Sequence, residues 1–373
     1  MLSIILNILL FVAVLAILIL VHEFGHFIVA KKSGIRVDEF GLGFPPKLWG
    51  RKYGETTYTL NALPFGGFVK IFGEDPNDEN TNGPDRARSF VHKPRYIQAA
   101  VLVAGVTFNF LFACLLLSVG FMVGMPSSVD EGYSQYTKDK HILITKVGEL
   151  SPASSAGLSV GDAIISVGSV DKILQGDALT SKNIQDFVAS HGDQSLAVTY
   201  KRAGESKTVS ITPIVNAIEG RSLPAVGIAM EEVGTVVLPI HLAFYEGFRF
   251  ASSLFVETIK GLYGLIAGAF SGHSDLSQVT GPVGIVGMVG EASRMGFIYL
   301  LTFTSLISIN LAVVNLLPFP ALDGGRLLFV GIEAIKRTPI NTKVVNTLNF
   351  AGFAILIILM LVVTFQDVLK LFR

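Results

Sequence analysis

The sequence predicts a polytopic α-helical membrane protein with four transmembrane helices and one α+β domain outside the membrane. The first observation is composition: of 373 residues, 50% are hydrophobic and only 16% are charged, against roughly 25% charged in a typical soluble protein. The second is that the missing charge is concentrated in four long uncharged blocks. The third is that the chain between the second and third blocks has the pattern of a small soluble domain.

The four uncharged blocks cover residues 1–21, 97–125, 297–322 and 344–365. At a rise of about 1.5 Å per residue, each can cross a hydrocarbon core of about 30 Å as a helix. A cleaved secretory signal fits the first block poorly, because the block lacks a basic start, is too long and precedes no small-residue cleavage site. Residues 238–270 are apolar but carry four charges, which favours peripheral helices on the membrane surface or beside the bundle over a fifth span.

Basic residues follow the first block, precede the second, and lie between the third and fourth. Because lysine and arginine in short loops mark the cytoplasmic side, these loops are predicted to face the cytoplasm. Both termini and the segment between the second and third blocks then face outward. The resulting regions are 1–125 with two spans, 126–234 as an extracytoplasmic domain, 235–296 as amphipathic peripheral helices, and 297–373 with two spans.

Charge and cysteine content exclude some classes of partner and site. The 29 basic and 29 acidic residues give a net charge of zero, which gives no support to a nucleic-acid partner. Cys114 is the single cysteine, so the chain forms no internal disulfide and no thiolate metal site.

The outside domain is predicted to contain strands at 142–144, 196–200 and 209–212 and a short helix at 184–189. Its segment 151–167 reads SPASSAGLSVGDAIISV and resembles the core of bacterial PDZ domains. The resemblance implies an extracytoplasmic PDZ domain, which accepts extended peptides or peptide C-termini by strand addition.

Candidate catalytic residues follow the first uncharged block directly, in the sequence HEFGH. His22 and His26 are four residues apart, so they project from one face of a helix and can reach the same Zn²⁺. Glu23 can lie beside a zinc-bound water without ligating the ion and act as general base. The alternative is a set of interfacial polar residues, but ionisable groups continuing a membrane helix are functional candidates by default.

A catalytic zinc site needs a third protein ligand and an open fourth position. Asp323 is the candidate, because it ends the third block at the same predicted depth, in the run NLLPFPALDGG. Pro318 and Pro320 break the helix and the following glycines permit sharp turns. A plain helix-terminating aspartate is the alternative.

Together, HEFGH in the first span, a PDZ-like segment after the second and NLLPFPALDGG closing the third closely resemble the site-2 protease family, of peptidase M50 type, in its RseP-like bacterial branch. The resemblance covers nearly the whole chain. It implies Zn²⁺ as cofactor, with His22, His26 and Asp323 as ligands and Glu23 as catalytic base. It also assigns Asn315, in the family's N-x-x-P run, to substrate handling.

Two further segments carry the resemblance. The second span reads AGVTFN at 104–109, where the family shows AGP…N, so valine replaces the proline and Asn109 matches the family's asparagine as a substrate-binding candidate. Strands at 56–60 and 67–71, on either side of residues 64–66, resemble the family's membrane-associated β-hairpin. Gly67 and Phe68 are its substrate-binding candidates, since an exposed strand edge near the zinc could hold an unwound substrate. An ordinary cytoplasmic hairpin is the alternative.

The resemblance implies an intramembrane zinc endopeptidase of a bacterial plasma (inner) membrane, active near the cytoplasmic side. Its expected partners are the lipid bilayer and single-span membrane proteins, such as pre-trimmed anti-sigma factors in regulated intramembrane proteolysis or signal-peptide remnants. A catalytically silent peptide receptor is a second hypothesis, opposed by the intact His22, Glu23, His26 and Asp323. A transporter is a third, and it predicts inverted repeats, whereas the sequence shows no internal repeat.

Overall fold

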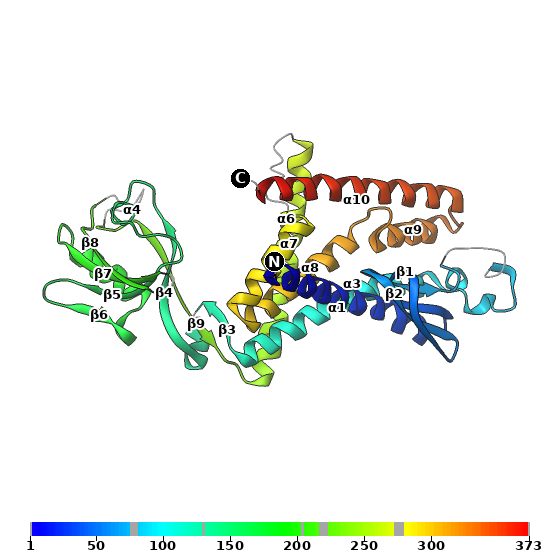
Figure 1. The fold of residues 1–373 in the computed structure, drawn as a ribbon, viewed down its shortest axis with the longest axis horizontal. Coiled ribbons are helices and arrows are strands. Elements are labelled where there is room, and N and C mark those ends of the chain that lie inside the picture. The colour runs from blue at the N-terminus through cyan, green and yellow to red at the C-terminus, as the bar shows by residue number, and fades with distance from the viewer. Residues whose placement is uncertain are drawn as a thin grey trace. The chain divides into compact units, whose positions relative to one another are not determined.

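A computed structural model describes residues 2–74, 81–128, 131–202, 205–215, 223–271 and 280–371. The chain forms two compact units, one of Met1–Gly120 with Ile240–Arg373 and one of Phe121–Pro239. The first unit holds long helices and a two-stranded sheet, and the second is built on a seven-stranded sheet (Figure 1).

The helical unit contains seven α-helices with assigned bounds and one pair of strands within the described residues. In chain order they are α1 (Leu2–Lys32), β1 (Val37–Tyr53), β2 (Thr56–Ile71), α3 (Arg95–Val123), α6 (Ile240–Phe270), α7 (Pro282–Met295), α8 (Phe297–Leu316), α9 (Asp323–Lys336) and α10 (Thr342–Leu371). The helix α3 is the most enclosed of the long apolar helices: half of its most apolar stretch is buried, compared with a third or less for the others.

Within the described residues, five helices are long and apolar enough to cross a membrane, namely α1, α3, α6, α8 and α10. Four of them correspond to the predicted blocks, although α8 ends at Leu316 rather than at 322, and α6 occupies the region predicted to hold peripheral helices. The charges of α6 do not interrupt it, because Glu246 pairs with Arg249 and Glu257 with Lys260, each three residues apart on one face. Figure 1 shows α6 running across the direction of α1 and α10 rather than alongside them.

The end of α1 follows from its sequence. Gly34 adopts a left-handed conformation with φ of 68°, and the amide of Ile35 donates to the carbonyl of Ala30 at 3.0 Å. This is a Schellman-type ending, which glycine favours because it lacks a Cβ. The chain therefore turns sharply after Lys32 and enters β1, which returns alongside α1.

The β-hairpin differs from the predicted one. Residues 56–60 and 67–71 do not pair with each other, because both pair with β1: Gly41 lies opposite Phe68 on one side and Thr59 on the other. The turn of the hairpin lies between β1 and β2, where Gly54 has φ of 61°. The prediction failed because β1 carries few β-branched residues and two prolines, and so lacks the composition typical of a strand.

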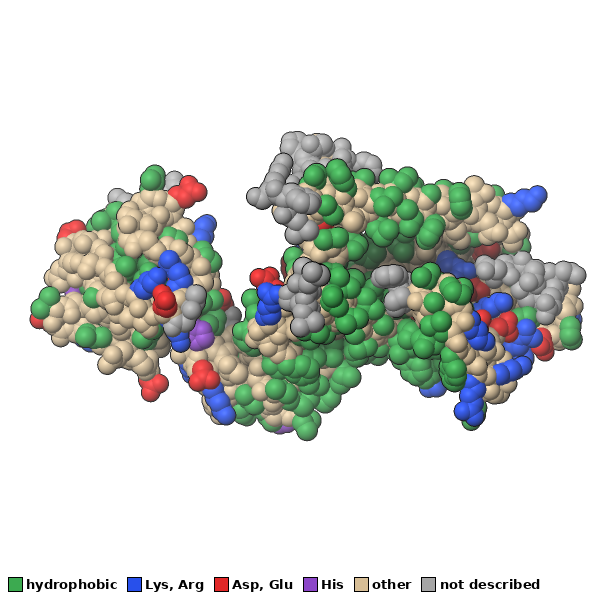
Figure 2. Space-filling model, in the orientation of Figure 1, with side chains coloured by type: hydrophobic (Ala, Val, Ile, Leu, Met, Phe, Trp, Pro, Cys, Tyr) green, Lys and Arg blue, Asp and Glu red, His purple; other side chains and the backbone are tan. Residues whose placement is uncertain are grey.

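Ion pairs attach the turn of this hairpin to the end of α1. Glu55 accepts hydrogen bonds from Lys31 and from Arg88, and Arg36 donates to Asp85. Figure 2 shows charged side chains gathered at the β1–β2 end of the helical unit, while hydrophobic side chains cover the helices beyond it. This distribution is expected of a unit whose helices lie in lipid and whose β1–β2 turn lies in water.

The second unit contains seven strands in the described residues: β3 (Met125–Ser128), β4 (Thr137–Val147), β5 (Ala163–Gly168), β6 (Ile173–Gln175), β7 (Leu196–Arg202), β8 (Glu205–Ile211) and β9 (Ile228–Val236). Their order is β3-β9-β4-β5-β7-β8, and β6 pairs with β5. The helices α4 (Pro152–Ser155) and α5 (Ser181–Ser190) complete the unit. The predicted strands in β4, β7 and β8 and the predicted helix in α5 are confirmed.

The PDZ-like segment closes the core of this unit. Ser151 caps α4 by accepting the amide of Ser154, and Asp162 accepts hydrogen bonds from Arg202 and from the amide of Ser159. The hydrogen bond from Arg202 holds the pKa of the Asp162 carboxyl below its usual value. Apolar side chains from the sheet and from α5 form the core, among them Ile142, Ile144, Ile164, Ile184, Phe187 and Leu196.

Candidate metal centre

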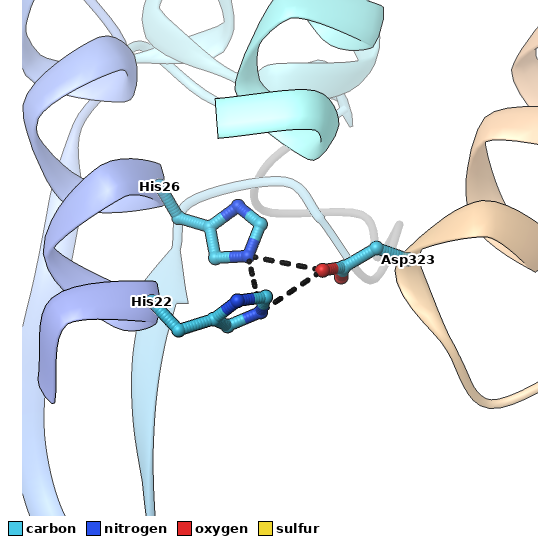
Figure 3. A group of neighbouring side chains, drawn as sticks. All are labelled: His22, His26 and Asp323. Carbon is cyan, nitrogen blue, oxygen red and sulfur yellow. Dashed lines mark hydrogen bonds and ion pairs between the residues drawn. The ribbon is translucent and has the colours of Figure 1, made fainter. Parts of the chain in front are cut away.

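The two histidines of the HEFGH sequence lie on one face of α1 and are buried. Their Nε2 atoms are 3.2 Å apart. Oδ2 of Asp323 lies 3.0 Å from Nε2 of His22 and 3.3 Å from Nε2 of His26. Figure 3 shows the three side chains converging from α1 and from the start of α9. The structure thus brings together the three residues predicted as ligands.

Asp323 reaches this position through the loop that follows α8. Pro318 and Pro320 prevent the helix from continuing, and the loop folds back onto the first turn of α9. A Cβ on Gly324 would fall 2.2 Å from the carbonyl oxygen of Leu317, and one on Gly325 would lie 2.2 Å from that of Phe319. Both positions therefore need glycine, and the tight loop fixes the direction of the aspartate.

The residues fit a zinc ion by a geometric test. Three ligand atoms bonded to one tetrahedral zinc at about 2.0–2.1 Å lie about 3.3 Å from one another. The three distances here are 3.0, 3.2 and 3.3 Å. Oδ2 of Asp323 is also buried without a hydrogen-bond partner among the described residues, as expected of an atom that serves a cation. Two imidazoles and one carboxylate are a donor set typical of catalytic zinc, which leaves the fourth position open.

The helix α3 forms the wall behind the two imidazoles. Nδ1 of His26 lies 2.8 Å from the carbonyl oxygen of Val101, and Nδ1 of His22 lies 3.3 Å from the amide of Asn109. Between them, Gly105 faces both rings, and a Cβ there would fall 2.4 Å from Nε2 of His26. The sequence alone predicts no role for Val101 or Gly105. The spacing of four residues from 101 to 105 to 109, equal to that of the histidines, is the signal that could have found them.

Glu23 lies half-buried beside the metal centre, at the hairpin. Its Cγ would be 3.4 Å from a Cβ on Gly67, which also faces Ile19 of α1. Gly67 therefore lies against the predicted base. Phe68, the next residue, packs its ring over Gly41 within the sheet.

Two other predicted substrate-binding residues are placed differently. Asn109 is fully buried and its amide faces His22. Asn315 lies half-buried in the last turn of α8. Among the described residues, the contacts that hold the three ligand side chains include Asn109 and do not include Asn315.

Comparison with known proteins agrees with this geometry. The model of peptidase family M50 matches residues 10–359. The zinc metalloprotease RasP of Geobacillus kaustophilus is 30% identical, over 97% of each chain. A Clostridium perfringens protein with a provisional zinc metalloprotease name is 36% identical, over 94% of this chain and 95% of its own.

Among solved structures, the crystal structure of the PDZ domain of the SdrC-like protein from Listeria monocytogenes is 21% identical and covers 24% of this chain and 85% of its own, with a TM-score of 0.20. The likeness that decides the family is the sequence match, which runs from α1 to α10 and so includes both histidines and the aspartate. On that match and on the ligand geometry, this chain belongs to peptidase family M50 and is a zinc metalloprotease.

Proposed function

We propose that this protein is an intramembrane endopeptidase that cleaves a bond within or next to a transmembrane segment of a single-span membrane protein. The observation that carries the proposal is the position of the metal centre. His22 and His26 belong to a helix that is long and apolar enough to cross a membrane, and Asp323 follows another such helix by seven residues. Ionisable residues within membrane segments mark functional sites, and a site at that depth is open to the membrane-embedded segment of a substrate.

The chemistry is peptide hydrolysis. Bound at His22, His26 and Asp323, zinc supplies a Lewis acid that polarises the scissile carbonyl and acidifies water. Glu23, one residue after a ligand, takes the proton of the attacking water and passes it to the leaving amine. Gly67 of the hairpin leaves room for this carboxylate, because a Cβ there would lie 3.4 Å from Cγ of Glu23.

The substrate is proposed to enter between α1 and the hairpin. An apolar hollow of about 440 Å³ lies there, lined by Leu20, Val21, Phe24, Phe27, Phe40 and Tyr58. Its residues Leu20, Val21, Phe24 and Phe27 belong to α1, the helix that carries the catalytic base. Residues 63–71 form an outer strand of the sheet, which can pair with an unwound substrate by backbone hydrogen bonds while the hollow receives its apolar side chains.

The second unit is proposed to act as a PDZ domain that limits access to the protease. A groove of about 140 Å³ lies between α5 and the start of β9, and its apolar lining includes Val188, Leu223, Val226, Ile228 and Met230. A groove beside a strand and a helix accepts an extended peptide or a peptide C-terminus. Substrates already trimmed by another protease, including anti-sigma factors and signal-peptide remnants, offer such ends.

The proposed topology has four spans in a bacterial plasma membrane, with the second unit and both termini outside and the β1–β2 turn on the cytoplasmic side. The helix α6 then lies across the bundle. If α6 crossed the membrane, the chain would have to cross back before α8 begins. The helix between them, α7, has 14 residues, about 21 Å of helix, which is too short to cross a core of about 30 Å. The α7 segment also lies at the outward ends of two spans, since Gly290 faces Asn7 of α1 and the amide of Gly284 donates to Asp367 of α10.

The test is to place the purified protein in liposomes with a tagged single-span substrate and to identify the cut bond by mass spectrometry. We expect a cut within the apolar stretch or within a few residues of it. A cut confined to the water-exposed tails of the substrate would contradict intramembrane cleavage.

A further inference from the structure

Three positions on one face of α3 meet the two histidines of α1. Val101, Gly105 and Asn109 are four residues apart, as are His22 and His26, and successive residues at this spacing stack along a helix. The carbonyl of Val101 contacts Nδ1 of His26, Gly105 leaves room for both rings, and the side chain of Asn109 contacts Nδ1 of His22.

The hydrogen bond to Val101 fixes the tautomer of His26. A carbonyl oxygen only accepts, so Nδ1 of His26 carries the proton and donates across 2.8 Å. Nε2 then has a free lone pair, and it faces Oδ2 of Asp323. The hydrogen bond that one ring nitrogen of a histidine makes decides where the proton sits, and so which nitrogen can bind a metal.

His22 needs the same arrangement for its Nε2 to bind the same ion. Its Nδ1 must then be a donor, and the group it faces is the side-chain amide of Asn109 at 3.3 Å. That amide is fully buried, and its Oδ1 has no hydrogen-bond partner among the described residues. Because the two ends of an amide have nearly the same shape, turning it over brings this unused acceptor to Nδ1 of His22.

The backbone of Asn109 is held as well. The hydroxyl of Ser308 on α8 donates to the carbonyl oxygen of Asn109 at 2.8 Å. This contact joins α3 to α8, the helix whose following loop leads to Asp323. One position on α3 therefore contacts a ligand histidine with its side chain and α8 with its backbone.

We propose that Asn109 is a positioning residue of the metal centre, whose Oδ1 accepts a hydrogen bond from Nδ1–H of His22 and so holds the Nε2 lone pair towards the ion. This assigns to Asn109 a role other than the substrate contact predicted from the sequence. The proposal rests on the metal centre of the proposed function, and not on which peptide bond is cut.

The test compares zinc affinity of the purified full-length protein, by chelator competition, for wild type, Asn109→Leu and Asn109→Asp. Leucine nearly matches the shape of asparagine but cannot accept a hydrogen bond from His22, whereas a carboxylate can. Ser118→Ala is the control, because Ser118 is equally buried on α3 and donates to the carbonyl of Cys114, away from the centre. Thermal unfolding of the metal-free variants establishes that all are folded.

We expect Asn109→Leu to weaken zinc binding by about 10–100-fold, the usual effect of losing a partner of a metal-binding histidine. Asn109→Asp and Ser118→Ala should stay close to wild type. Equal zinc affinity in Asn109→Leu and wild type would overturn the proposal, and a higher KM in that variant would then indicate substrate contact. Equal losses in Asn109→Leu and Asn109→Asp would overturn it in favour of packing. Wild type that binds no zinc would instead refute the metal centre itself.

Discussion

A methyl group on Gly105 would fall 2.4 Å from Nε2 of His26 and 2.6 Å from Cε1 of His22. These atoms belong to rings that cannot move without leaving the metal position. Gly105→Ala should therefore lower zinc affinity at least as much as loss of one hydrogen bond to a ligand, about tenfold.

The matched control is Gly261→Ala on α6, where a Cβ meets no atom within 4 Å and alanine favours the helix. Zinc titration of both variants checks the prediction. If Gly105→Ala binds zinc like wild type, α3 does not lie as close to the imidazoles as the structure places it.

In the second unit, Asp162 gives a pH-dependent prediction. Its side chain is buried, and Arg202 lowers its pKa in the folded protein. The folded state then binds fewer protons than the unfolded state around the ordinary carboxyl pKa of about 3.9, so this pair stabilises the unit above that pH and less so as pH falls through the lowered pKa.

Arg202→Met should reduce hydrogen-exchange protection of β5 and β7 in the full-length protein at pH 7. The difference from wild type should narrow below about pH 4, because the unpaired carboxyl then takes up a proton. A difference that is constant across this range would mean that the stabilisation comes from packing of the arginine and not from the ion pair.

The sequence allowed the candidate ligands to be predicted because their signal is local. His22 and His26 share a helix face by spacing alone, and Asp323 follows two prolines and precedes two glycines. The part played by Gly105 could not be predicted, because its contribution is a missing side chain whose partners lie about eighty residues away in α1. Asn109 was identified from the sequence, but only the structure shows that its amide faces a histidine.

At the scale of elements, the loop between α8 and α9 should be intolerant of added atoms. Gly325→Ala would place a Cβ 2.2 Å from the carbonyl oxygen of Phe319. Such overpacking costs about 1–3 kcal/mol, and relief by movement of the loop would displace Asp323.

Gly331 offers a matched control on the same helix, since a Cβ there meets no atom within 4 Å. We expect Gly325→Ala to lower both the thermal unfolding temperature and zinc content, and Gly331→Ala to change neither. Full zinc content in Gly325→Ala would show that the loop does not fix the aspartate.

Two elements differed from the sequence-based expectation for physical reasons. The strand β1 contains Pro45, Pro46 and three glycines, and its pairing with β2 is decided by packing on α1, where Phe27 contacts Phe40 and Tyr58. The helix α6 is continuous because its charges pair along one face. The packing of β1 on α1 is not visible in the residue-by-residue pattern, whereas the three-residue spacing of the charges on α6 is.

At the scale of the whole molecule, the orientation of α6 decides the number of spans. With Cys114 replaced by alanine, the single variant Ser271→Cys reports on the end of α6. If α6 lies across the bundle, a membrane-impermeant maleimide should label this cysteine from the outside. Labelling from the cytoplasmic side alone would show that α6 is a fifth span.

Two further single cysteines calibrate that experiment. Val170→Cys, at a fully exposed position of the second unit, should be labelled from outside. Thr338→Cys, between α9 and α10, should be labelled from the cytoplasmic side. The reverse pattern for this pair would invert the proposed topology.

The most direct test of the central claim measures zinc content and cleavage of a single-span substrate in the same liposomes, for wild type and Glu23→Gln. Because Glu23 is not a ligand, both proteins should hold about one zinc per chain, and only wild type should cleave. Cleavage by Glu23→Gln at the wild-type rate, or cleavage by wild type stripped of zinc, would contradict the account.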